Sequence, residues 1–145
     1  MKRFEFHLAS ALNWRSQRLA AEKARLEDLL GRRIQIRNRI EASGLQWEKS
    51  RENTLSKATI SAFDLSALDS FRRALDHERA RLENEMSELD LQIEGQRKKV
   101  VEADRQCRLL EKLRDRRYAE WRKLAEREWE KEASDLYLAK WNREP

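Results

Sequence analysis

Apolar side chains recur along this chain at alternating steps of four and three residues, in two separate runs. The first run follows Leu8, Leu12, Leu19, Leu26, Leu29, Ile36, Ile40 and Trp47, with Arg15, Glu22, Arg33 and Ser43 at the remaining positions. The second run extends from Leu65 to Leu124, where thirteen of eighteen positions on the same grid are apolar. A stripe this narrow, repeated every seven residues, predicts helices that pair along a seam rather than cover a globular core.

The two runs are separated by residues 50–64, SRENTLSKATISAFD, where Ser, Thr and Asn accumulate and the stripe lapses. Ser61 and Asp64 have the spacing of a capping box, with Asp in place of the usual Glu or Gln. The pattern predicts one helix over about residues 5–55, a hinge over about 56–61 and a second helix over about 62–141, in a single domain of residues 1–145. Gly44 is a competing position for a break or kink.

A short hinge makes the two helices antiparallel neighbours, so residues whose numbers add to about 119 face each other. Leu26 then meets Ile93, and Leu12 meets Cys107, so that apolar side chains face each other along the seam. The second helix is longer by about 25–30 residues, or ~40 Å, and residues 116–144 overhang. The expected fold is all-α: an antiparallel two-helix coiled-coil hairpin with an overhanging C-terminal helix.

The overhang is rich in aromatic residues, with three of the five tryptophans and both tyrosines of the chain. Its one apolar face presents Tyr118, Trp121, Ala125, Trp129, Ala133 and Leu136. An isolated helix cannot bury such a face, so we expect a partner to cover it. Phe4 and Phe6 are expected to lie beside residues 113–115 of the second helix.

Composition and charge support two long helices and give them a polarity. Charged residues make up 41 % of the chain, which has only three glycines and one proline. Residues 1–40 carry 10 basic and 4 acidic side chains, and residues 97–131 carry 13 and 8, whereas residues 41–96 carry 7 and 12. The hairpin therefore places two basic flanks together and the acidic stretch around the hinge.

The sequence predicts a protein of the cytoplasm. No apolar stretch approaches the ~20 residues that a membrane-spanning helix needs, and no secretory signal is recognised at the N-terminus.

The sequence shows no clear candidate for a metal, phosphate-binding or catalytic site. His7 and His77 lie at opposite ends of the predicted hairpin, and Cys107 has no second cysteine, whereas a metal site needs three or four converging ligands. The glycines are isolated inside helical pattern, so no phosphate-binding loop is expected. We therefore expect no catalytic residue, no metal and no cofactor, and the protein is not expected to be an enzyme.

Two basic stretches, residues 96–100 and 112–123, could contact the phosphates of nucleic acid. Interspersed acids, such as Glu120 near Lys123, favour a solvated helix face instead. No nucleic-acid partner is therefore expected.

Phe4, Phe6, Leu8, Leu12 and Arg15 form an N-terminal pattern that resembles the start of the flagellar export protein family FliJ. The segment LEKLRDRRYAEWRKLAEREWEKEASDLYLAKWNR at 110–143 is similar to the end of that family, and ISAFDLSALDSFRRALDHERARL at 60–82 is similar to its connection before the second helix. The resemblance covers nearly the whole chain.

The resemblance implies a non-catalytic coiled coil, similar to the γ stalk of rotary ATPases, in flagellar or type III protein export. The implied partners are the ring-forming export ATPase and its regulator, the membrane export gate protein and export chaperones. Through them a monomeric, cytoplasmic protein would lie at the inner face of the cell membrane.

By analogy with the stalk, the end that faces the ATPase would carry Phe4, Phe6, Arg15, Tyr118, Trp121 and Trp129. The hinge end, which would face the export gate, carries Trp47, Phe71 and Leu75. From the residues alone, Trp47 either fills the seam or belongs to a surface patch with Leu45, Phe63 and Phe71.

Two other interpretations stay open. The chain could be a generic coiled-coil spacer or oligomerisation protein, or a basic helical arm that binds nucleic acid.

Overall fold

A computed structural model describes residues 2–143, which form two long helices and no strand. Helix α1 spans Ala9–Leu55 and helix α2 spans Ala62–Trp141. The two helices pack against each other, which confirms the expected all-α helical hairpin. The contacts divide the chain into two units: a hairpin unit, Ala21–Val100, and a terminal unit, Met1–Ala20 with Val101–Pro145. The single domain expected from the sequence stays a prediction.

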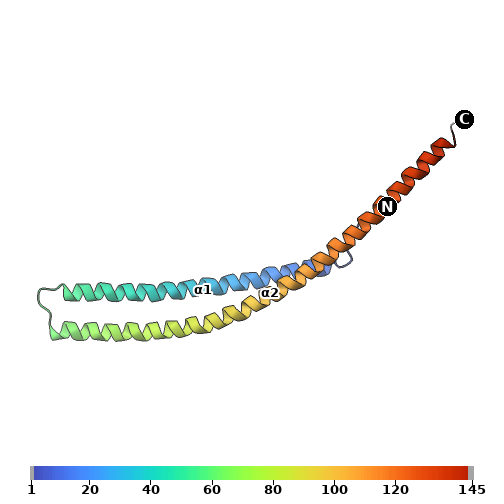
Figure 1. Cartoon of the computed structure of the whole chain (residues 1–145). Coiled ribbons are helices and arrows are strands. Elements are labelled where there is room, and N and C mark those ends of the chain that lie inside the picture. Colours follow the sequence, from blue (N-terminus) through green and yellow to red (C-terminus); the bar gives the residue numbers. More distant parts are fainter. Residues whose placement is uncertain (1, 144–145) are drawn as a thin grey trace. The chain divides into compact units, whose positions relative to one another are not determined.

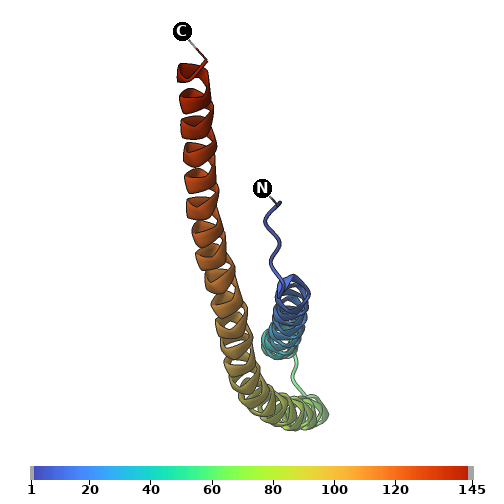
Figure 2. The same ribbon diagram turned by 90° about the vertical axis from the view of Figure 1, so that its right-hand side faces the viewer.

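In the hairpin unit, α1 and α2 run antiparallel and side by side from the connection at residues 56–61 (Figures 1 and 2). Its core is the predicted seam. Leu82, Leu89 and Ile93 of α2 are buried, and the seam positions of α1 from Glu22 to Trp47 are all buried or half-buried. Two helices cover only one stripe of each other, so most other side chains stay exposed.

The seam departs from the predicted grid near the hinge. Leu65 of α2, a seam position of the second run, is exposed. Arg72 and Arg79, which were expected to extend toward solvent or to meet acids across the seam, are exposed as well. Both arginines turn instead to acids one turn further along their own helix, Asp76 at 3.8 Å and Glu83 at 3.1 Å. A charged side chain keeps its hydration this way, which a place in the seam would remove.

A polar pair interrupts the apolar seam inside the hairpin unit. Gln96 and Glu22 are both buried, and the Gln96 side-chain amide donates to the backbone carbonyl of Glu22 at 3.0 Å and to the Glu22 carboxylate. Further along, Arg33 Nε donates to Asp90 Oδ1 at 2.7 Å across the seam. The Glu22–Gln96 pair restricts the register, because a shifted pairing would leave its buried polar groups without partners. The Arg33–Asp90 pair is exposed and contributes less.

The hinge occupies the predicted residues 56–61, and side chains define where α2 begins. Ser61 Oγ accepts from the Asp64 backbone N–H and the Asp64 carboxylate accepts from the Ser61 N–H, both at 3.1 Å. This reciprocal pair is the capping box that the sequence predicts. Lys57 Nζ lies 3.4 Å from the same carboxylate. At Gly44, where the sequence offered a competing break, α1 continues without interruption.

Helix α1 begins at Ala9, four residues later than predicted. The carbonyl of Phe6 accepts from Ala9 N–H at 3.0 Å, and the carbonyl of Leu8 accepts from Leu12 N–H at 2.9 Å. No Ser, Thr, Asp or Asn precedes Ala9 to cap an earlier start. The expected end of α1 at residue 55 and the expected span of α2 are confirmed.

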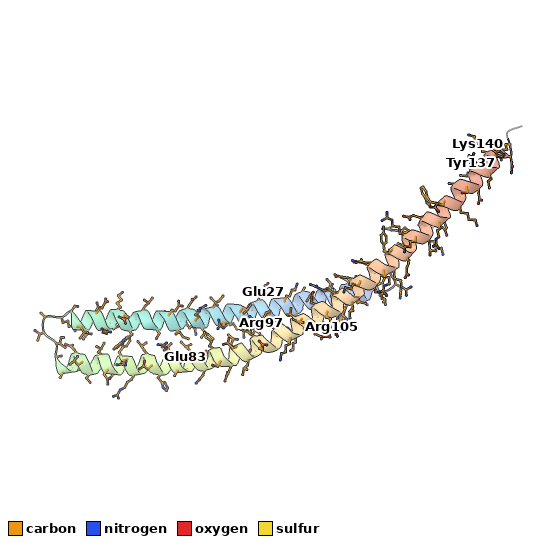
Figure 3. All side chains as sticks on the ribbon, in the orientation of Figure 1. Glu27, Glu83, Arg97, Arg105, Tyr137 and Lys140 are labelled. Atoms are coloured by element: carbon orange, nitrogen blue, oxygen red, sulfur yellow. The ribbon has the colours of Figure 1, made fainter. Side chains whose placement is uncertain are left out.

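In the terminal unit, the start of α1 packs on α2 beyond Val101. Ala103 and Cys107 are buried there, and Leu8, Leu12 and Leu19 are half-buried. From Glu126 to Arg143 every residue of the unit is exposed. Figure 3 shows Tyr137 and Lys140 projecting from the last turns of α2. The overhang predicted over residues 116–144 is therefore shorter than expected, because Phe4 packs on Tyr118 and Trp121. Residue 144 lies outside the described residues.

We expect Leu82→Ala to lower the free energy of unfolding by about 3 kcal/mol, since it leaves a cavity in the seam. Leu82 is 1 % exposed. Leu91→Ala is the matched control, because Leu91 is 76 % exposed on the same helix, and it should change stability by less than about 0.5 kcal/mol. Urea titrations followed by circular dichroism measure both, and equal losses would contradict the seam.

The capping box predicts a pH dependence. The backbone and side-chain hydrogen bonds of Ser61, with a smaller contribution from Lys57, lower the pKa of Asp64 from its ordinary 3.8. Ionised Asp64 therefore stabilises the fold above that pH, and the stabilisation is lost as pH falls through the lowered pKa.

Asp64→Ala should consequently unfold at lower urea than the native chain at about pH 7, with the difference shrinking toward about pH 2. Paired urea titrations across this range measure the difference. A constant difference at every pH would show that the Asp64 carboxylate plays no such part.

Candidate partner-binding surfaces

An aromatic cluster joins the N-terminal segment to α2 in the terminal unit. The ring of Phe4 meets Tyr118 edge-on with centroids 5.2 Å apart, and lies 5.8 Å from Trp121. Tyr118 and Trp121 stack at 5.7 Å on one face of α2. Trp121 Nε1 donates to the Lys2 carbonyl at 3.2 Å. Residues 2–8 are thus held on α2 although they are not helical.

Phe4 reaches further along α2 than predicted. The expected neighbours were residues 113–115, about one turn short of Tyr118 and Trp121. The expectation assumed a helix from about residue 5, with ~1.5 Å rise per residue. A non-helical segment covers up to ~3.3 Å per residue, so the same residues extend past the predicted position.

Phe6 and Arg15 do not join this aromatic cluster. Phe6 is half-buried, and its ring lies 5.9 Å from that of His7. It still lines an open hollow of about 970 Å³ between residues 2–7 and α2, together with Arg117, Trp121 and Leu124. Arg15 turns to the seam, where it donates to the Gln106 side-chain carbonyl.

Arg15 of α1 is linked through Gln106 to a set of side-chain hydrogen bonds on α2. Gln106 Nε2 donates to the Glu102 carboxylate at 3.1 Å, and Arg105 donates to the same group at 2.8 and 3.1 Å. The Arg105 bond first, and then the Gln106 bond, lower the pKa of Glu102. The carboxylate in turn raises the pKa of Arg105. Arg15 therefore positions α1 on α2 and is only partly available to a partner.

Trp129 stands apart from the cluster on the exposed part of α2. It is 74 % exposed, and with Ala125 it borders a shallow hollow lined also by Arg122, Glu126 and Glu130. A side chain of this size exposed in the unpartnered chain marks an interaction surface more strongly than scattered leucines do.

At the hinge end, the structure brings together two of the three predicted residues. Trp47 and Leu75 line a hollow of about 230 Å³ with Ser43, Gly44, Asp76 and Arg79. The Arg72 guanidinium lies 5.7 Å from the centre of the Trp47 ring. Phe71 is not among the lining residues and is 36 % exposed. Trp47 is itself half-buried, so it both fills the seam and contributes to the surface.

Two features of these surfaces were not predicted from the sequence. Trp14 is 52 % exposed and carries the guanidinium groups of Arg15 and Arg18 at 4.8 and 5.4 Å from its ring. The spacing of Trp14 and Arg18, one helical turn apart, could have indicated this contact. The bond from Trp121 to the Lys2 carbonyl had no sequence signal, because it depends on backbone placement.

Within residues 2–143, no group of three or more His, Cys, Asp or Glu side chains could hold a metal ion. No helix in that part of the chain is long and apolar enough to cross a membrane.

No protein-family model, curated protein or solved structure matches the chain.

Phe4→Ala should expose Trp121, because Phe4 covers its ring, and should loosen the N-terminal segment by about 1 kcal/mol. The measurement is acrylamide quenching of fluorescence in a chain whose other four tryptophans are replaced by Phe. Phe6→Ala in the same background is the control, since Phe6 contacts His7. Indistinguishable quenching in the two variants would contradict the cluster.

Proposed function

We propose that the protein is a non-enzymatic coiled-coil component of a flagellar or type III protein export apparatus. The observation that carries the proposal is the aromatic surface of the terminal unit, formed by Phe4, Tyr118, Trp121 and the exposed Trp129. It supports a binding role because Trp129 and Tyr118 stay 74 % and 46 % exposed, and Phe4 and Trp121 are only half-buried although they pack together. The resemblance of the N-terminal pattern to the FliJ family is the reason for proposing the export apparatus as the setting of this role.

The terminal surface suits a large partner of acidic character. Aromatic side chains with low conformational freedom supply much of the affinity at protein interfaces. Arg117 and Arg122 lie near them, each paired with an acid on the same helix, Glu120 at 3.7 Å and Glu126 at 3.3 Å. Residues 97–131 still carry 13 basic against 8 acidic side chains, and an excess of positive charge speeds association with an acidic surface. The proposed partner of this end is the ring-forming export ATPase.

The hinge-end surface is proposed to contact the membrane export gate protein. The hollow beside Trp47 and Leu75 offers a small apolar floor, with Arg72 across the indole ring and Asp76 and Arg79 at its edge. Two binding surfaces would let one chain connect two partners. Export chaperones and the ATPase regulator are proposed as further partners, and the place of action is the cytoplasmic face of the membrane.

The test is ATP turnover by the export ATPase encoded in the same genome, with and without the purified protein. Tyr118→Ala combined with Trp129→Ala should weaken stimulation by about tenfold or more, because interface aromatics often contribute 2 kcal/mol or more. The readout is the concentration that gives half-maximal stimulation.

Trp47→Ala is the matched control, an aromatic truncation at the hinge end that should leave stimulation intact while weakening binding to the export gate protein. Equal stimulation by the native chain and the double variant would remove the terminal surface from this role. No stimulation by the native chain would instead favour the coiled-coil spacer.

A further inference from the structure

In the terminal unit, one face of α2 carries a line of four exposed cations without acidic partners. The basic line consists of Lys112, Arg116, Lys123 and Arg127. Their spacing of four, seven and four residues places them within about 60° of one another around the helix. None of them forms an ion pair with another of residues 2–143, whereas the nearby Arg117 and Arg122 each pair with an acid of α2, at 3.7 and 3.3 Å.

The basic line lies on the side of α2 that faces away from α1. Arg116 is nine residues, or about two and a half turns, from Cys107, which is buried in the seam. Lys112 is equally far from Trp121, on which Phe4 packs. Neither α1 nor the N-terminal segment therefore covers the basic line, and the aromatic side chains of the proposed ATPase-facing surface lie on the other side of the helix.

The same line continues to three exposed apolar side chains at the end of α2, namely Tyr137, Leu138 and Trp141. They are 65 %, 57 % and 66 % exposed, and Figure 3 shows Tyr137 projecting from α2. Trp141 lies eighteen residues, or about five full turns, after Lys123, hence directly in line with it. Glu130 lies between the two groups, so the face keeps an excess of positive charge.

We propose that this face binds the surface of an anionic lipid bilayer. Lys and Arg side chains near such a surface are attracted by its lipid headgroups. Trp and Tyr side chains favour the boundary between headgroups and acyl chains. A flat surface contacts every member of a straight line at once, so α2 would lie along the membrane with its cations on the phosphates and its apolar end between the headgroups.

Nucleic acid fits this face less well. The phosphates of a duplex would meet the cations and leave Leu138 and Trp141 in water. A single strand is bound by aromatic rings that stack on bases all along a basic groove. Here the cations occupy ~22 Å of helix, and the apolar group begins ~15 Å beyond them.

This contact would add to the membrane association through partner proteins that the FliJ resemblance implies. It does not rest on the proposed function, because vesicles that contain no protein are enough to measure it. The aromatic surface of the terminal unit would stay accessible on a membrane-bound chain, because it lies on the other side of α2.

The experiment is co-flotation of the full chain with phosphatidylcholine vesicles, with and without phosphatidylglycerol. The native chain should float with the anionic vesicles alone, and the bound fraction should fall as salt rises. The quadruple variant changes every member of the basic line to Gln. It should bind about a hundredfold more weakly or less, because each cation contributes roughly fivefold.

The matched control loses the same four charges from cations of the hairpin unit that already pair with acids one turn away. It combines Arg25→Gln, Arg32→Gln, Arg37→Gln and Arg73→Gln. Its affinity should change by less than about fivefold, because these charges are locally paired and screened. Circular dichroism confirms that both variants stay helical. An equal loss in the two variants would show that only net charge matters and overturn the proposal.

Chains with a single tryptophan test the apolar end. With the other four tryptophans replaced by Phe, the emission of Trp141 should shift to shorter wavelength on anionic vesicles. A chain that keeps only Trp129, about 120° away around the helix, should show no shift. A native chain that does not bind anionic vesicles, or an unshifted Trp141, contradicts the proposal. Tighter binding to a DNA duplex than to vesicles at equal salt would also overturn it and favour the nucleic-acid arm.

Discussion

Every feature of this fold depends on one narrow seam between α1 and α2. Helices of 47 and 80 residues bury side chains only along the stripe where they touch, with Leu82, Leu89 and Ile93 buried in the hairpin unit and Cys107 in the terminal unit. Helices within proteins owe most of their stability to such packing. The surface ion pairs, mostly one turn apart on the same helix, add little.

The unequal length of the two helices leaves the last part of α2 exposed. Within the terminal unit α1 begins at Ala9, and the segment before it covers α2 only as far as Trp121. The aromatic side chains beyond have no intramolecular cover. A seam stabilises only what it covers, so the same constraint that builds the hairpin leaves Trp129 and Leu136 exposed.

The two candidate surfaces differ in how far sequence reasoning could reach them. Trp129 was predictable, because its exposure follows from the overhang alone. The hollow beside Trp47 was only partly predictable: Leu75 lies in it through the seam register, whereas Phe71 does not line it. Arg72 was assigned to the seam, but its guanidinium lies over the Trp47 ring. Neighbouring residues on a helix point about 100° apart, and side-chain rotamers then decide which of them line the hollow.

The sequence by itself determined the two helices, the hinge at residues 56–61 and the capping box at Ser61, because periodicity and local hydrogen bonds are properties of neighbouring residues. Tertiary structure decided the late start of α1 and the reach of Phe4 to Tyr118 and Trp121. It also decided how the buried Glu22 and Gln96 satisfy each other. These outcomes depend on contacts between residues far apart in the chain, where competing hydrogen bonds and apolar contacts are settled only once the helices have packed.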